Sequence, residues 1–156
     1  VRASLRMRPD RIIVGEIRGG EALDLLQAMN TGHSGSKATV HASSPLQALT
    51  RLETLALFSG LEIPVKALRE QVSSAIDFVI QASRLPDHSR KITHISEVLP
   101  LSTDGSYQVE DVFRFVHSKT ENGRIVGSHQ LTGYVPSVLG EMRIAGMEKA
   151  VALFEQ

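Results

Sequence analysis

The sequence contains no cysteine, no tryptophan and few aromatic residues, and its charges cancel. Without cysteine, disulfides and thiolate metal sites are excluded, which suits a reducing compartment. Seventeen basic residues balance seventeen acidic ones, and only 4% of the residues are aromatic, so a nucleic-acid partner is disfavoured. No apolar run approaches the roughly 20 residues that span a bilayer, and no signal peptide is recognisable. We therefore expect a cytosolic protein.

The remaining composition is that of an ordinary globular domain. The 156 residues are 42% hydrophobic and 22% charged, which is enough for one substantial core. The chain opens on Val1 rather than methionine, and a core strand is predicted within a dozen residues. We expect a fragment of a longer protein, although an alternative start codon would also give this beginning.

Residues 11–41, RIIVGEIRGGEALDLLQAMNTGHSGSKATVH, organise the first half of the chain. A continuous β-branched run at 12–14 predicts a strand covered on both faces, followed by Glu16. A helix is predicted at 21–29 and a second strand at 37–41, which ends in His41. Because parallel strands deliver their last residues to one edge of a sheet, we expect Glu16 and His41 to lie close together.

The rest of the chain changes character near residue 84. Before it, a Ser-Ser-Pro entry predicts a helix at about 46–58, and a second helix and an apolar strand follow. After it, alternating patterns predict antiparallel strands and a hairpin turn, and then a helical segment that two glycines weaken. The expected division comes after the first of these strands, between residues 1–99 and residues 100–156.

On the pattern alone, Glu16 has two interpretations. A carboxylate at the end of a buried strand, before a helix-opening glycine pair, is where P-loop enzymes orient the attacking water or hold the magnesium shell. A capping or salt-bridged glutamate would look the same.

Three motifs carry a family resemblance. The stretches IIVGEIRGGEA, NTGHSGSKATVHASSP and RLETLAL resemble the Walker B and histidine boxes of the secretion and pilus-assembly traffic ATPases. LRMRPDRII and LREQVSSAIDFVIQASR are similar to the type IV secretion branch, and within it to the CpaF-like (tight-adherence pilus) ATPases.

The resemblance implies an α/β fold, namely part of a RecA-like P-loop core with a mostly parallel sheet and flanking helices. An antiparallel hairpin and a helix would follow it. It also implies a homo-hexamer that uses ATP and Mg²⁺ and meets platform proteins of a secretion or pilus system. Such a protein would be cytoplasmic and peripheral at the inner membrane, with no nucleic acid as partner.

By the same resemblance, Glu16 is the Walker B glutamate, which polarises the attacking water and helps to hold magnesium indirectly. Gly15 stands where a generic Walker B strand has aspartate, as is usual in this family, so magnesium is weakly specified. His33 and His41 fall on the histidine box, where an imidazole can hydrogen-bond a phosphate oxygen. A solvated His33, a structural His41, or a zinc-binding pair are the alternatives.

Arginines near these boxes are candidates for phosphate contacts, because a guanidinium meets two phosphate oxygens at once. They are Arg6, Arg8, Arg11 and Arg18. Thr31 and Thr39 could assist by hydrogen bonding, and each of these residues has a solvated or structural alternative. Arg51 and Glu53 are interpreted as a structural or interface ion pair.

The phosphate-binding loop itself is missing, since no G-x-x-x-x-G-K-[ST] occurs and residues 32–37 have the wrong spacing. We expect that these residues alone do not bind ATP, that the loop lies upstream, and that apolar surface is exposed. The alternative is a non-catalytic RecA-like interaction domain that docks to a secretion platform or to intact ATPase subunits.

Overall fold

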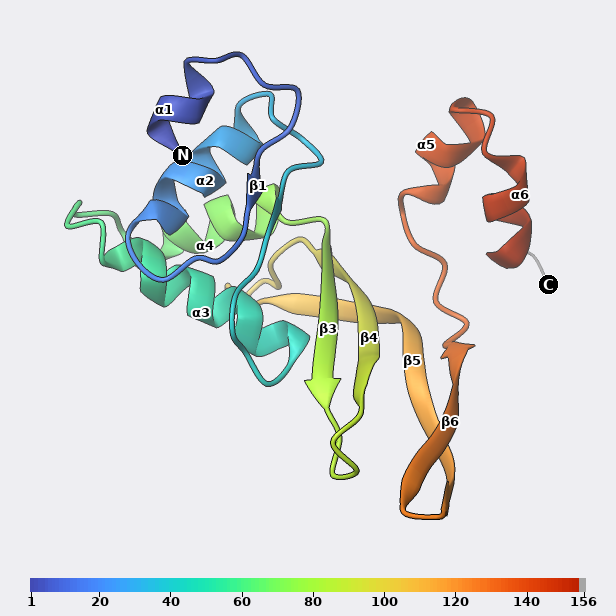
Figure 1. Ribbon diagram of the computed structural model, residues 1–156. Coiled ribbons are helices and arrows are strands. Elements are labelled where there is room, and N and C mark those ends of the chain that lie inside the picture. Colours follow the sequence, from blue (N-terminus) through green and yellow to red (C-terminus); the bar gives the residue numbers. More distant parts are fainter. Residues whose placement is uncertain (155–156) are drawn as a thin grey trace. The chain divides into compact units, whose positions relative to one another are not determined.

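The computed structural model describes residues 1–154 and divides them between two compact units, each discontinuous in sequence (Figure 1). Unit 1 combines Val1–Val79 with Val98–Val109, and unit 2 combines Ile80–Glu97 with the residues from Glu110 onward. The division into residues 1–99 and 100–156 stays a prediction.

Unit 1 alternates helices with two short strands. In chain order its elements are α1 (Arg2–Leu5), β1 (Ile13–Val14), α2 (Glu21–Asn30), β2 (Lys37–Ala38), α3 (Pro45–Leu57) and α4 (Val65–Ala75). The predicted helices and both predicted strands are therefore present, with the strands shorter than expected.

β1 and β2 form a parallel pair in which Ile13 faces Lys37 and Val14 faces Ala38. Backbone hydrogen bonds continue the pairing beyond these residues, from the Lys37 N–H to the Ile12 carbonyl (2.9 Å) and from the Ile17 N–H to the Thr39 carbonyl (2.9 Å). The two segments therefore run side by side as far as the residues that flank Glu16.

The expected RecA-like core with a mostly parallel sheet is not confirmed. The parallel sheet has two strands, whereas the larger sheet has four strands in the order β3-β4-β5-β6. The strand at 12–14 is also not covered on both faces, because Ile12 is 6% exposed and Ile13 is 77% exposed. Side chains alternate along a strand, and only one face of this sheet packs on the helices.

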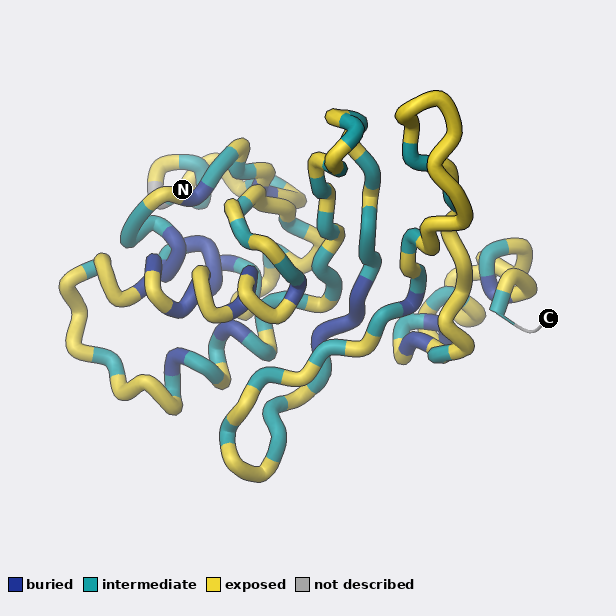
Figure 2. The backbone as a smooth tube through the Cα atoms, turned by 90° about the horizontal axis from the view of Figure 1, so that it is seen from below, coloured by how far each residue is buried: buried dark blue, intermediate teal, exposed yellow. Residues whose placement is uncertain are grey.

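The core of unit 1 lies among α2, α3 and α4, where the buried segments of Figure 2 gather. The side chains of Leu25, Leu49 and Leu68 are at most 1% exposed. α3 begins as the sequence predicts, since the Ser44 hydroxyl accepts the Gln47 N–H at 3.2 Å and Pro45 occupies the first turn.

Unit 2 contains most of the four-stranded antiparallel sheet. The four strands are β3 (Phe78–Arg84), β4 (Arg90–Leu99), β5 (Gln108–Glu121) and β6 (Arg124–Leu131). The β5–β6 turn has positive φ at Asn122 (49°) and Gly123 (73°), as the tight hairpin turns require, so the predicted hairpin turn is confirmed.

The helical segment at the end of the chain is broken into α5 (Leu139–Ile144), α6 (Glu148–Val151) and a short 3₁₀ turn (Ala152–Phe154). Gly146, with φ 71°, interrupts it, as the two glycines in the sequence suggested. Across residues 1–154, no helix combines the length and apolarity needed to cross a membrane.

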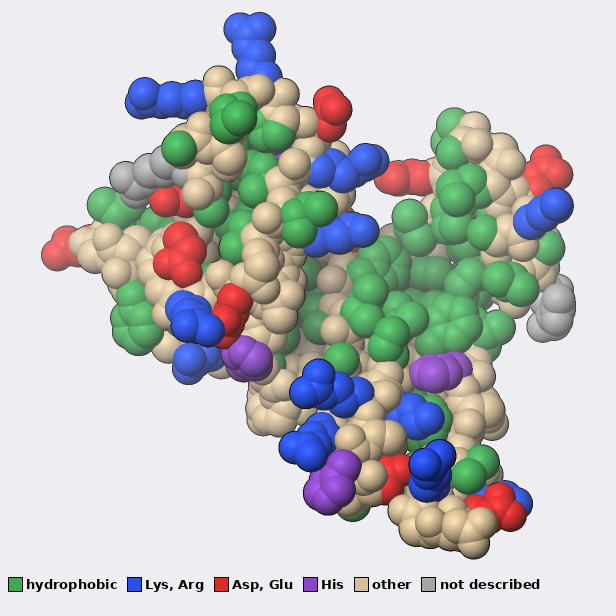
Figure 3. Space-filling view, in the orientation of Figure 1, with side chains coloured by type: hydrophobic (Ala, Val, Ile, Leu, Met, Phe, Trp, Pro, Cys, Tyr) green, Lys and Arg blue, Asp and Glu red, His purple; other side chains and the backbone are tan. Residues whose placement is uncertain are grey.

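Apolar side chains reach the surface in both units, as the green areas of Figure 3 show. Ile13, Phe58 and Ile80 are each more than 60% exposed. The predicted exposed apolar surface is therefore confirmed.

Candidate functional site

Glu16, His41 and Arg18 come together at the carboxyl end of the parallel pair. The His41 Nε2 atom lies 2.8 Å from Glu16 Oε1, and an Arg18 guanidinium nitrogen lies 2.5 Å from Glu16 Oε2. The Glu16 side chain is 26% exposed, whereas those of His41 and Arg18 are 84% and 79% exposed. The predicted proximity of Glu16 and His41 is therefore confirmed.

The turn after Glu16 is fixed by the first residue of α2. Glu21 Oε1 accepts the backbone N–H groups of Arg18 (2.7 Å) and Gly19 (3.1 Å). The Arg18 amide is the main reason that the pKa of Glu21 is lowered. The backbone of the turn is thus anchored, while the side chain of Arg18 extends into solvent.

Arg18 also controls the electrostatics of Glu16. Its hydrogen bond is the largest influence on the pKa of Glu16, which is lowered, and His41 contributes in the same direction. A carboxylate that stays ionised accepts hydrogen bonds from water but is a weak proton acceptor. This arrangement suits a group that orients a water molecule rather than one that removes its proton outright.

His33 is not at this edge of the sheet. It lies in the loop that leads into β2, at the amino end of the strand, whereas Glu16 follows the carboxyl end of β1. Its Nδ1 atom is buried and has no hydrogen-bond partner among the residues that the structure describes. The structure therefore does not bring His33 to Glu16 and His41, and its role as a phosphate sensor stays a prediction.

The remaining predicted residues are exposed. Thr39 contributes its backbone to the strand pairing, and Arg6 and Arg8 follow α1, with Arg8 in the left-handed region (φ 49°). Within residues 1–154, no ion pair involves Arg6 or Arg8. Their contacts with phosphate stay predictions.

A polar hollow of about 330 Å³ adjoins His41, and the sequence analysis missed it. Its wall is the solvent side of α3, which contributes Gln47, Thr50, Arg51 and Thr54. These residues follow the spacing of one helix face, and this periodicity in the sequence could have identified them. The lining contains cationic and neutral polar groups and no carboxylate.

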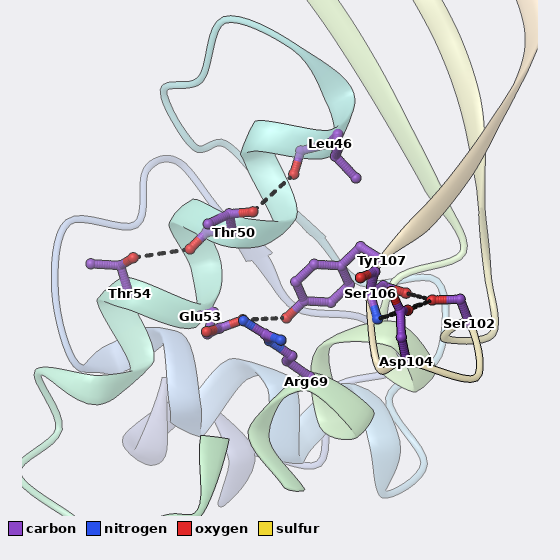
Figure 4. Close-up of polar contacts among 9 residues, drawn as sticks. All are labelled: Leu46, Thr50, Glu53, Thr54, Arg69, Ser102, Asp104, Ser106 and Tyr107. Atoms are coloured by element: carbon purple, nitrogen blue, oxygen red, sulfur yellow. Dashed lines mark hydrogen bonds and ion pairs between the residues drawn. The ribbon is translucent and has the colours of Figure 1, made fainter. Parts of the chain in front are cut away.

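Arg51 and Glu53 do not pair, because residues two apart on a helix point in different directions. Glu53 instead accepts the Arg69 Nε–H (3.0 Å) and the Tyr107 hydroxyl (3.1 Å) on one oxygen (Figure 4). The bonds tie α3 to α4 and to the segment before β5. The prediction of a structural role for Glu53 thus holds with different partners.

Glu16 and its two partners lie apart from the larger hollow of unit 1. That hollow, about 550 Å³, lies between α4 and the loop after β4 and is lined by none of the predicted site residues. The part of the chain that the structure describes also has no group of three or more metal-binding side chains.

These features place the chain among the α/β proteins that have a polar site at the carboxyl edge of a parallel sheet. More narrowly, the chain belongs to the family described as "Type II/IV secretion system protein", whose model matches residues 1–131.

The relatives include proteins named for conjugal transfer and for type IV secretion. The chain is 44% identical over 96 residues to a putative conjugal transfer protein of Mycobacterium tuberculosis, covering 62% of this chain and 27% of the relative. It is 45% identical over 86 residues to the type IV secretion system protein PtlH of Bordetella pertussis, covering 54% and 25%. The chain thus spans about a quarter of these relatives' length.

A solved structure resembles the chain as well. It is the crystal structure of the VirB11 ATPase from the Brucella suis type IV secretion system in complex with sulphate. The TM-score is 0.57 at 32% identity, and the match covers 62% of this chain and 30% of that one. The comparisons support the type II/IV secretion family, and the finer assignment to the tight-adherence branch stays a prediction.

Proposed function

We propose that this chain is the part of a secretion-system ATPase that supplies the carboxylate for ATP hydrolysis. The observation that carries the proposal is the meeting of Glu16 and His41 at the carboxyl edge of the parallel strands, 2.8 Å apart. Membership of the secretion family and likeness to a protein described as an ATPase support it.

In this proposal Glu16 orients the water that attacks the γ-phosphate, and His41 holds the other side of the carboxylate. Arg18 contributes positive charge where phosphate charge develops. Arg6, Arg8 and Thr39 are assigned to phosphate contacts, and Mg²⁺ would be brought by the phosphates, with Glu16 acting on it only through water.

The phosphate-binding loop must come from residues outside this sequence, because the sequence contains none. We therefore assign the chain to a larger ATP-hydrolysing polypeptide, which forms a homo-hexamer and works with platform proteins at the cytoplasmic side of the inner membrane. Pilus assembly in the tight-adherence manner and protein export are both within this proposal.

The test uses the complete open reading frame that encodes these residues, purified and assayed for ATP hydrolysis. Glu16→Gln keeps the shape of the side chain and removes its charge, so turnover should fall about 100-fold or more while ATP binding is retained. Glu62→Gln, at an exposed position before α4, is the matched control and should leave turnover unchanged. Near-normal hydrolysis by Glu16→Gln would exclude Glu16 as the hydrolytic carboxylate.

The absence of the phosphate-binding loop favours a second candidate, a non-catalytic domain that docks to a secretion platform or to intact ATPase subunits. The two differ in the DNA upstream of Val1. An in-frame phosphate-binding motif supports the ATPase, whereas a ribosome-binding site and a start codon at Val1 support the docking domain. For the 156 residues alone, calorimetry should detect no ATP binding at micromolar concentrations.

A further inference from the structure

Both carboxylate oxygens of Glu16 are engaged by cationic or proton-donating side chains. Arg18 lies 2.5 Å from Oε2, and His41 lies 2.8 Å from Oε1. A water molecule that is to be oriented for attack must donate a hydrogen bond to this same carboxylate. The contacts therefore describe a resting arrangement in which each oxygen of Glu16 already has one partner, so a water molecule must share the carboxylate with Arg18 and His41.

The contact between Arg18 and Glu16 can break without movement of the backbone. Glu21 fixes the backbone N–H of Arg18, so the position of its Cα does not depend on the contact with Glu16. Its side chain is 79% exposed, and an ion pair in water is held weakly because solvent screens both charges. The guanidinium can therefore change partners while the turn stays in place.

A phosphate group is a better partner for Arg18 than one carboxylate oxygen. The shortest contact with Glu16 joins a guanidinium nitrogen to Oε2, and the other oxygen of Glu16 lies against His41. A phosphate offers two or three oxygens to the planar fork and carries more negative charge. The solvent-facing position of Arg18 leaves the fork accessible to such a ligand.

We propose that Arg18 is a positioning residue that holds Glu16 at rest and transfers to the polyphosphate chain of the nucleotide when it binds. The Arg18 N–H groups leave Oε2 and donate to phosphate oxygens, and a water O–H then donates to the vacated Oε2. His41 keeps its place on Oε1. This inference rests on the proposed function, since it assumes that Glu16 orients the water.

The test follows Glu16 and Arg18 by NMR in the complete open reading frame that encodes these residues, because the 156 residues lack the phosphate-binding loop. Tripolyphosphate is the probe. The side-chain carboxyl carbon of Glu16 reports its pKa, and the Nε–Hε resonance of Arg18 reports its partner. Without ligand, Arg18→Gln should raise the pKa of Glu16, and Arg18→Lys should raise it less. Arg84→Gln, an exposed arginine in unit 2, should leave it unchanged.

Tripolyphosphate should shift the Arg18 resonance in a saturating manner and bring the pKa of Glu16 up to its value in Arg18→Gln. Sodium chloride at matched ionic strength should do neither, which separates partner exchange from screening. A Glu16 pKa that is the same in the wild type and Arg18→Gln would overturn the proposal. An Arg18 resonance that does not shift when tripolyphosphate is added would also overturn the proposal.

The two proposals fail in different experiments. If Glu16→Gln leaves ATP turnover intact, the proposed function falls, although the NMR exchange can still be observed. If Glu16→Gln abolishes turnover and Arg18 stays on Glu16 in the presence of tripolyphosphate, only the exchange is refuted.

Discussion

Gly20 is the residue whose substitution should most directly disturb the turn that carries Arg18. A Cβ atom at Gly20 would lie 2.7 Å from the Ser59 Cα and 2.8 Å from the Ser59 nitrogen. The backbone of Gly20, with φ −61° and ψ −15°, suits alanine, so the cost of Gly20→Ala is steric alone.

The size of the effect follows from this contact. Carbon atoms in contact are normally about 3.5–4.0 Å apart, so the start of α2 and the loop after α3 must separate by about 1 Å. The opposing atoms belong to the backbone and cannot turn aside as the end of a side chain can. Overpacking of this kind costs about 1–3 kcal/mol.

Urea unfolding followed by far-ultraviolet circular dichroism measures the loss, because the three longest helices, α2, α3 and α4, all lie in unit 1. With a slope of about 1–3 kcal/mol per molar urea, a loss of about 2 kcal/mol lowers the midpoint by about 1 M. Gly15→Ala is the control, since no atom lies within 4 Å of its added Cβ. It should be neutral or slightly stabilising.

Equal midpoints for Gly20→Ala and Gly15→Ala would refute the reasoning, because the two positions differ in the neighbouring backbone and not in the chemical change. The backbone amide signals of Arg18 and Gly19 should also move in Gly20→Ala and stay in place in a variant that leaves the turn intact.

Two further predictions concern the contacts that hold each unit. Tyr107→Phe removes the hydroxyl that donates to Glu53, and the free energy of unfolding should fall by about 1–2 kcal/mol, measured by urea unfolding. Asp87 accepts the Ile125 amide at 2.8 Å, which chiefly lowers its pKa from 3.8 to about 2. Its stabilisation is therefore present above pH 3.8 and is lost as the pH falls towards 2. In Asp87→Asn, the Ile125 amide should exchange faster than in the wild type at neutral pH, and the difference should shrink near pH 2.

The sequence was most informative where a local rule fixes the geometry. The pairing of Glu16 with His41 follows from the parallel arrangement of two short strands, which needs no knowledge of the rest of the fold. The Asn122–Gly123 turn follows from residues that tolerate positive φ. In both cases the information lies within a few neighbouring residues.

The sequence was least informative where partners come from distant segments. Arg69 and Tyr107 reach Glu53 from 16 and 54 residues away, and no periodicity in the chain reveals either contact. His33 was grouped with His41 by motif, although the strand between them carries the two residues to opposite ends. The sequence did not predict the exposure of Ile13. A β-branched run indicates a strand, but it does not show whether one or both faces of the sheet are covered.

The charges around Glu16 explain why the proposed site needs further residues. Arg18 balances the charge of one carboxylate, and the polar hollow beside His41 is lined by Arg51 and no acidic group. A nucleoside triphosphate brings several negative charges, so Arg18 cannot serve both Glu16 and the phosphates at full strength. Either Arg18 changes partner or the additional cations come from outside unit 1, and the response of Glu16 to tripolyphosphate decides between these two outcomes.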